Sequence, residues 1–225
     1  MKENTNLAIK STLKLVLFLI LIFAFAGRLN YWQGWVFFIH TLLLTVVLFI
    51  IFRNKMDLFK ERMHPGPGTK KWDIVFYIFF IPAAIAPIII GPLDSGRFYW
   101  TQTLPMWVYI ASYLIYTLTI VFLTWAMFVN RWFSSVVRIQ KDRKQKVVTT
   151  GPYAYVRHPG YAGAIPMFVT MGLIFGSYWA ILPGLIALML LFVRTYLEDT
   201  TLQNELQGYK AYTKKVKYRL IPGVW

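Results

Sequence analysis

Cysteine is absent from this chain of 225 residues, and histidine occurs only three times, at His40, His64 and His158. Without cysteine, the protein has no disulfide, no thiolate zinc site and no cysteine nucleophile. The three histidines lie far apart in the sequence, so a histidine-rich metal cluster is not expected. We therefore predict no metal site.

Charged residues are also scarce. They make up 15% of the chain, whereas hydrophobic residues make up 57% and aromatic residues 18%. A soluble domain carries roughly 45–50% apolar and about 25% charged residues, so this chain has too few polar side chains to cover a water-soluble core. The composition excludes a water-soluble globule, a disordered chain and a fibrous repeat. It predicts an all-α, polytopic membrane protein.

Acidic residues number nine, against 24 lysines and arginines, which gives a net charge of +15. In a soluble protein this excess would suggest a nucleic-acid partner. Here the basic residues lie between long apolar runs, which is typical of membrane topology and of contact with anionic lipid headgroups. Since no DNA or RNA recognition motif is present, the expected partners are membrane lipids and not nucleic acids.

Long apolar runs predict five or six transmembrane helices, because one crossing needs about 20 mostly apolar residues. Four runs each predict one helix. A fifth run is too long for one crossing and is interrupted at Gly176, Ser177, Pro183 and Gly184, so it predicts a C-terminal hairpin of two helices. The predicted ranges are 7–26, 31–52, 74–90, 105–129 and, for the hairpin, 161–196.

The positions of lysine and arginine predict the orientation of these helices. All basic residues except Arg28 and Arg97 fall in segments that share one side of the membrane if the chain crosses six times. Both termini are therefore expected in the cytoplasm, with the cell (inner) membrane as the expected location. We predict one integrated domain, with N-terminal transmembrane helices over 1–129 and a cofactor-binding region with a cytosolic pocket over 130–225.

Polar residues and helix breakers gather at the two ends of the predicted hairpin. The first cluster is 151–161, and the second runs from Arg194 into an aromatic, basic tail. A hairpin brings its two ends together on one side of the membrane, so these clusters become neighbours. His158 precedes Pro159, which is a favoured first residue of a helix, and free backbone N–H groups there would attract a carboxylate or phosphate.

The second cluster adds groups of a different kind. Glu198 and Asp199 favour a cation or ribose hydroxyl groups, the nearby tyrosines offer flat surfaces, and Arg194 lies one helical turn before Glu198. Such a pocket is compatible with S-adenosylmethionine, a zwitterion joined to an aromatic base. Each feature alone has a simpler interpretation: His158 as an ordinary helix cap, the acidic pair as a solvated helix end, and the tyrosines as an interfacial aromatic belt.

Taken together, Arg157-His158-Pro159-x-Tyr161, a helical hairpin and an acidic pair before an aromatic basic tail resemble the isoprenylcysteine carboxyl methyltransferase family. The resemblance covers residues 130–225. It implies that Arg194 is catalytic and holds the reacting carboxylate. The family often has a second glutamate where this chain has Asp199. The residues that the resemblance assigns to binding S-adenosylmethionine are Val148, Gly151, Tyr153, His158, Tyr161, Glu198 and Asp199.

The resemblance implies methyl transfer from S-adenosylmethionine to a lipidic or small hydrophobic acceptor, with carboxyl O-methylation favoured. A carboxylate needs no general base, so such an enzyme mainly aligns two reactants and excludes water. Phospholipid N-methylation is an alternative, because the related phospholipid methyltransferases are similar in the same elements. Two further functions stay open: a membrane NADPH-dependent reductase, although no glycine-rich dinucleotide loop is present, and a non-catalytic lipid-binding membrane protein.

Overall fold

The structure is a computed structural model that describes residues 15–53 and 67–225. Within these residues all regular secondary structure is helical. The long helices are α2 (Trp32–Phe52), α4 (Lys71–Gly91), α5 (Met106–Val129) and α7 (Ile181–Glu205). The shorter elements are Leu15–Ala26, the π-helix η1 (Pro92–Phe98), the 3₁₀ turns η2 (Lys141–Arg143) and η3 (Gly151–Ala154), α6 (Pro159–Ile174) and α8 (Tyr209–Lys215). Residues 7–14 of the first predicted span lie outside the described residues.

Four helices are long and apolar enough to cross a bilayer, and they cover Trp32–Phe52, Lys71–Phe98, Met106–Val129 and Ile181–Glu205. Their surfaces expose large apolar side chains, such as Leu43 at 60%, Phe79 at 61% and Ile110 at 63%. Extended apolar surfaces of this kind are rare on water-soluble monomers. The predicted all-α membrane architecture is confirmed, with four candidate spanning helices in the described part of the chain. The 16-residue α6 is just below the range of about 17–25 residues that usually crosses a bilayer, and it packs against the longer α7.

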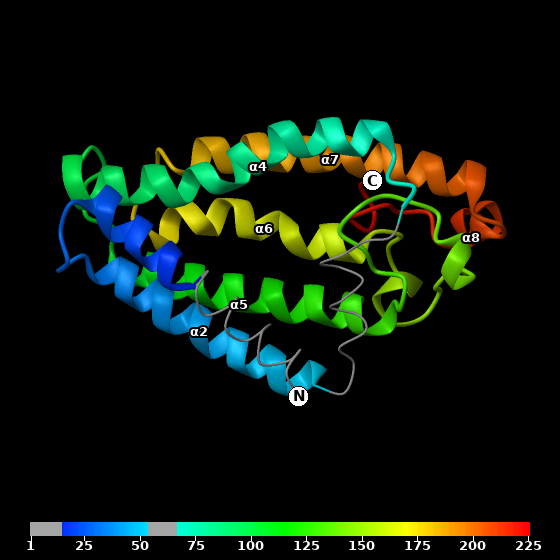
Figure 1. The fold of residues 1–225 in the computed structure, drawn as a ribbon, viewed down its shortest axis with the longest axis horizontal. Helices are drawn as coiled ribbons and strands as arrows, with labels where there is room; N and C mark the ends of the chain where they lie inside the picture. Colours follow the sequence, from blue (N-terminus) through cyan, green and yellow to red (C-terminus); the bar gives the residue numbers. More distant parts are fainter. Residues whose placement is uncertain (1–14, 54–66) are drawn as a thin grey trace.

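The helices run along one long direction (Figure 1). Helices α4 and α7 lie side by side, α6 packs against both, and α5 packs against α6. Helix α2 joins this bundle on the side of α5, where the ring of Phe37 contacts the ring of Tyr116. The bundle therefore holds the α6–α7 hairpin against helices that precede it in the chain.

Helices α6 and α7 form the predicted hairpin. Gly176 in the turn has a φ of +72°, a left-handed conformation that glycine adopts without a steric penalty. Gly184 allows α7 to cross close to α6, because a Cβ atom at this position would lie 2.1 Å from the carbonyl oxygen of Phe168. The two ends of the hairpin therefore come together at the opposite end of the bundle, beside α8 (Figure 1).

A buried carboxylate anchors the hairpin turn. Asp94 in η1 is fully buried and accepts hydrogen bonds from the backbone N–H of Thr101 at 2.7 Å and from its hydroxyl at 2.6 Å. It also accepts a hydrogen bond from the hydroxyl of Ser177 in the hairpin turn. This cluster ties the turn to the segment after η1, at the end of the bundle far from α8.

Candidate functional site

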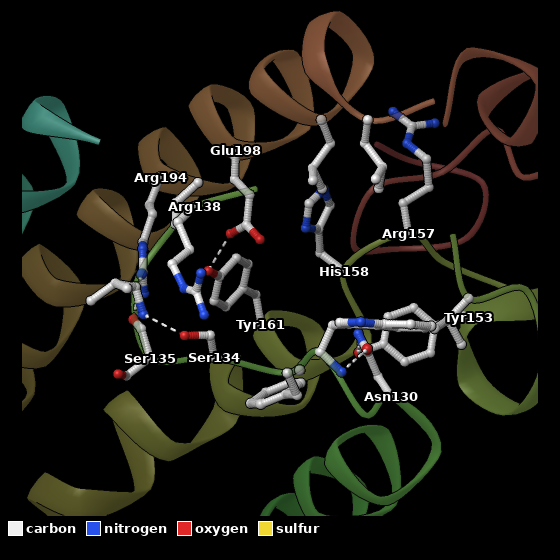
Figure 2. Close-up of a pocket in the computed structure, with 18 of the residues that line it drawn as sticks. Asn130, Ser134, Ser135, Arg138, Tyr153, Arg157, His158, Tyr161, Arg194 and Glu198 are labelled. Carbon is white, nitrogen blue, oxygen red and sulfur yellow. Dashed lines mark hydrogen bonds between the residues drawn. The ribbon is translucent and has the colours of Figure 1, made fainter. Parts of the chain in front are cut away.

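A cavity of about 370 Å³ lies at the end of the bundle that carries α8. The start of α6, the second half of α7, α8 and the segment 130–148 provide its polar and aromatic lining, which Figure 2 shows in close-up. Its apolar lining comes from the interior of the helix bundle. The apolar residues include Phe80, Leu123, Met167, Phe168 and Leu191. One cavity thus joins a polar part to an apolar part between helices.

His158 is the N-cap residue of α6, and Pro159 is the first residue of the helix, as predicted. The His158 ring is 6% exposed and lines the cavity. Its Nε2 lies 3.2 Å from Oδ1 of Asp199 and 3.4 Å from the hydroxyl of Tyr209. The ring is nearly parallel to the Tyr161 ring, with centroids 5.8 Å apart. These contacts fix the imidazole against one wall of the cavity.

Tyr161 and Glu198 come from the two helices of the hairpin and meet at the cavity. The hydroxyl of Tyr161 donates a hydrogen bond to the Glu198 carboxylate, as the dashed line in Figure 2 shows. Glu198 and Arg194 both line the cavity, so the face that was predicted for them on α7 is confirmed. The hairpin therefore brings groups from both sequence clusters to one place.

Arg194 is 6% exposed and is held by a residue that the sequence analysis did not single out. Its Nε donates to Oδ1 of Asp73 at 2.8 Å, and its Nη2 donates to Oδ2 at 3.2 Å. Nη2 also donates to the backbone carbonyl of Ser135 at 2.7 Å. Asp73 lies in the first turn of α4 and is fully buried. An ion pair between α4 and α7 thus holds Arg194 in place at the cavity wall.

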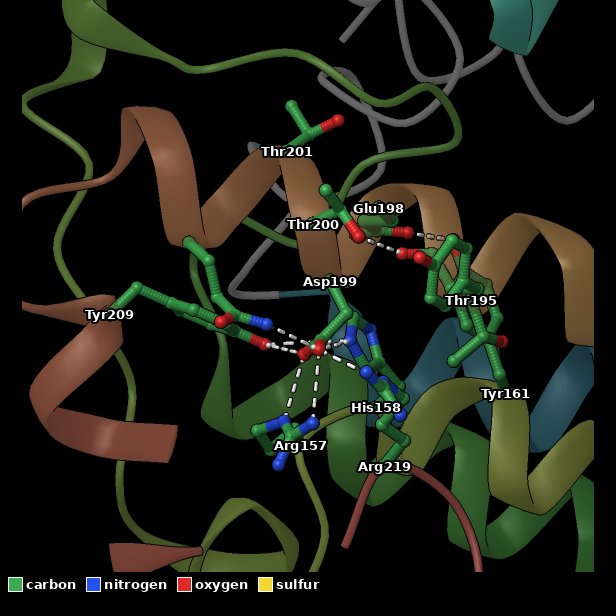
Figure 3. A network of polar contacts seen from close by, with 12 residues as sticks. Arg157, His158, Tyr161, Thr195, Glu198, Asp199, Thr200, Thr201, Tyr209 and Arg219 are labelled. Carbon is green, nitrogen blue, oxygen red and sulfur yellow. Dashed lines mark hydrogen bonds and ion pairs between the residues drawn. The ribbon is translucent and has the colours of Figure 1, made fainter. Parts of the chain in front are cut away.

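Asp199 is not among the residues that line the cavity, although its neighbour Glu198 is. Consecutive helical residues project about 100° apart, and Asp199 projects toward the C-terminal tail, where it is fully buried. Figure 3 shows the donors that converge on it. They are Arg157 (2.8 and 3.0 Å), Gln203 (2.8 Å), Arg219 (2.9 Å), Tyr209 (3.0 Å) and His158 (3.2 Å).

This network fixes the C-terminal tail against the start of α6. Besides Asp199, Arg157 binds the carbonyls of Val216 at 2.9 Å and Lys217 at 2.7 Å. The backbone N–H of His158 donates to the carbonyl of Arg219 at 2.9 Å. The structure therefore places Asp199 behind His158 and Tyr209, where it supports two residues of the cavity wall.

The remaining predicted residues, Val148, Gly151 and Tyr153, precede α6. Val148 and Tyr153 line the cavity, whereas Gly151 does not and instead begins the turn η3 that carries Tyr153. The Tyr153 hydroxyl accepts a hydrogen bond from Asn130 at 3.0 Å, and its carbonyl accepts one from Tyr212 at 2.6 Å. Burial raises the pKa of Tyr153 above its ordinary value, so its hydroxyl stays protonated at neutral pH.

Most of the segment 130–148 carries no recognisable sequence motif. Gln140 in this segment is 1% exposed, donates to the carbonyl of Trp132 at 2.7 Å and accepts from Arg143 at 2.7 Å. Arg138, which is 4% exposed, lines the cavity and binds Asp142 at 2.8 Å. No motif marks these residues. Asp73 carried a usable signal, because it is one of only nine acidic residues and directly precedes an apolar run.

Residues 110–204 match the model of the isoprenylcysteine carboxyl methyltransferase family. The match begins in α5 and contains α6 and all of α7 except its last residue, including His158, Arg194 and Glu198. This segment is therefore similar to that family, and the long apolar helices are those of an integral membrane protein. Asp73, α8 and the tail lie outside the matched residues. No curated protein matches this chain.

Proposed function

We propose that this protein is an integral-membrane, S-adenosylmethionine-dependent methyltransferase. The proposal draws on the match of residues 110–204 to the isoprenylcysteine carboxyl methyltransferase family. Its proposed acceptor is a lipidic or small hydrophobic carboxylic acid. One observation carries the proposal: His158, Arg194 and Glu198 line a single cavity that has both a polar and an apolar part.

The residues of the polar part fit S-adenosylmethionine. Glu198 offers a carboxylate to a cationic group, and the parallel rings of His158 and Tyr161 offer a flat surface to a purine or a cation. The first turn of α6 borders the cavity at Gly160, where the helix dipole favours a negative group. When bound, the cofactor supplies an electrophilic methyl group on a sulfonium.

The acceptor is assigned to the apolar part and to Arg194. Phe80, Phe168 and Leu191 suit a hydrophobic body that enters from the bilayer, whereas Arg194 suits a carboxylate, which arginine binds through paired N–H groups. A carboxylate is already a nucleophile, so the side chains need only hold it in line and exclude water. Transfer to an amine would instead require a proton acceptor, for which Glu198 lies at the cavity.

Binding and transfer assays on the purified protein test this function. S-adenosylhomocysteine is titrated by calorimetry, and a labelled methyl group is followed from S-adenosylmethionine into S-farnesylcysteine or phosphatidylethanolamine. We expect saturable binding and a base-labile methyl ester on S-farnesylcysteine. Absence of saturable binding would contradict the cofactor assignment, and a base-stable label on phosphatidylethanolamine would replace O-methylation by N-methylation.

Substitutions on α7 and α6 separate cofactor binding from general stability. Glu198→Gln or His158→Ala is expected to weaken S-adenosylhomocysteine binding by about 1–3 kcal/mol, as expected for the loss of one buried hydrogen bond. The matched control is Glu205→Gln on the same helix, because Glu205 is exposed and its ion pair with Lys70 at 2.7 Å lies at the surface. Calorimetry checks the difference, and equal affinities for Glu198→Gln and wild type would contradict the role of Glu198.

We propose that the cavity end of the bundle faces the cytoplasm, with both termini there and six crossings in all, in the cell (inner) membrane. The absence of cysteine allows a direct test with single-cysteine variants. Tyr178→Cys, at an exposed position of the hairpin turn, is expected to react with a membrane-impermeant maleimide on intact cells. Lys215→Cys, on the exposed side of α8, is expected to react only after permeabilisation. The reverse pattern would invert the proposed topology.

A further inference from the structure

We infer that Asp73 is a positioning residue that holds the Arg194 guanidinium so that two of its N–H donors remain for an anionic group of the acceptor. Asp73 lies on α4, outside the residues matched by the family. The inference rests on the proposed function and extends it to a helix from the N-terminal half of the chain.

The hydrogen-bond donors of Arg194 are only partly used within the described residues. A guanidinium has five N–H donors in a planar fork. Asp73 accepts from Nε and Nη2, and the carbonyl of Ser135 accepts from the second N–H of Nη2. Among the described residues, none accepts a hydrogen bond from Nη1 of Arg194. Three donors therefore fix the fork, and two are left on a side chain that lines the cavity.

Aromatic rings restrict the guanidinium further. Its Cζ atom lies 4.8 Å from the ring centroid of Phe76, 4.9 Å from that of Tyr77 and 5.4 Å from that of Tyr161. Rings on α4 and α6 thus surround a fork whose edge is bound by Asp73. Such a fork presents Nη1 in one orientation, which lowers the entropy lost when a carboxylate binds.

Asp73 also fixes the cavity wall beside Arg194. Its Oδ2 accepts a hydrogen bond from the backbone N–H of Val137 at 2.7 Å, and the carbonyl of Val137 accepts one from the N–H of Lys70 at 3.0 Å. Val137 and its neighbour Val136 line the cavity. The first turn of α4 therefore holds both the guanidinium and the segment next to it.

The test compares two buried carboxylates at opposite ends of the bundle. Asp73→Asn removes the charge that orients Arg194, whereas the control Asp94→Asn changes a carboxylate that is equally buried and hydrogen-bonded but far from the cavity. Each full-length variant is purified in detergent. The measurements are the dissociation constant of S-adenosylhomocysteine, the unfolding temperature, and kcat and KM for S-farnesylcysteine at saturating S-adenosylmethionine.

We expect Asp73→Asn to lower kcat/KM for S-farnesylcysteine on the order of 100-fold, because the reacting carboxylate is misplaced, while S-adenosylhomocysteine affinity is retained. Asp73→Glu keeps the charge and should lose less. Asp94→Asn should lower only the unfolding temperature. Wild-type kcat/KM in Asp73→Asn, or a parallel loss of cofactor affinity, would overturn the inference.

If Asp73→Asn does not fold, Asp73→Glu carries the test, and wild-type kcat/KM in that variant would overturn the inference. The proposed function fails in a different way. If wild-type protein binds no S-adenosylhomocysteine or transfers no methyl group to S-farnesylcysteine, the proposed function falls and the role of Asp73 falls with it. If the wild-type protein transfers the methyl group and the Asp73 variants do so with wild-type kcat/KM, only the positioning role of Asp73 is rejected.

Discussion

Changing Arg194 to lysine is expected to lower the rate of methyl transfer on the order of 100-fold, with affinity for S-adenosylhomocysteine retained. Lysine keeps the positive charge that pairs with the buried Asp73. Its single ammonium cannot, however, bind the carboxylate of Asp73 at two points and still present a planar pair of donors to a second anion. Single-turnover transfer assays and calorimetry on the same preparation measure the two properties separately.

Lysine is a better choice here than alanine. Arg194→Ala would leave Asp73 buried without its cation, and a broken buried ion pair destabilises a protein strongly. A lost rate could then reflect unfolding. The matched control is Arg97→Lys, because Arg97 lies at the other end of the bundle, where its Nη2 donates to the carbonyl of Ala24 at 2.7 Å. If Arg194→Lys transferred the methyl group at the wild-type rate, the catalytic role of Arg194 would be contradicted.

Changing Asp199 to alanine is expected to destabilise the protein by about 3–5 kcal/mol, because it leaves the buried guanidinium of Arg157 without its carboxylate partner. Arg157 binds Asp199 through two donors and is 7% exposed, and Arg219 binds it at 2.9 Å. His158 and Tyr209 lose an acceptor in the same step. Thermal unfolding in detergent, followed by tryptophan fluorescence, measures the loss of stability.

The adjacent acid is the control for this change. Glu198→Ala removes a carboxylate that faces the cavity and accepts from Tyr161. It should therefore reduce cofactor affinity with a much smaller loss of stability than Asp199→Ala. If the two variants lost equal stability, or if Asp199→Ala unfolded at the wild-type temperature, Asp199 would not have the separate structural role that we assign to it.

The buried tyrosines of this end of the molecule remain hydrogen-bond donors. Burial, reinforced by the Asp199 carboxylate, raises the pKa of Tyr209 above its ordinary value, and burial does the same for Tyr212. Both hydroxyls therefore stay protonated at neutral pH. Tyr212 can hold the carbonyl of Tyr153, and Tyr209 can hold Asp199, without adding negative charge beside the cavity.

Much of this arrangement was predictable because it depends on local sequence. Apolar runs indicate helices, and breakers around Gly176 indicate a turn, so the hairpin and the meeting of its two ends follow. Pro159 marks the start of α6 and makes His158 its cap. The four-residue spacing of Arg194 and Glu198 places them on one helix face. Each of these inferences uses only spacing along one element.

Other features depend on how elements pack, and spacing along the chain does not show them. Asp199 follows Glu198 directly in the sequence, but adjacent helical residues face different neighbours, and only the position of the tail decides what Asp199 contacts. Likewise, Asp73 and Arg194 are 121 residues apart. Their contact arises because α4 packs against α7.

By itself, the sequence determined that this is an all-helical membrane protein with a C-terminal hairpin and which polar residues gather at its ends, because apolar length and helical periodicity are local properties. Tertiary packing alone decided which of those residues reach the cavity, which ones hold the tail, and that α4 supplies the counter-ion of Arg194. A buried charge needs a partner, but the sequence does not say which distant residue will provide it.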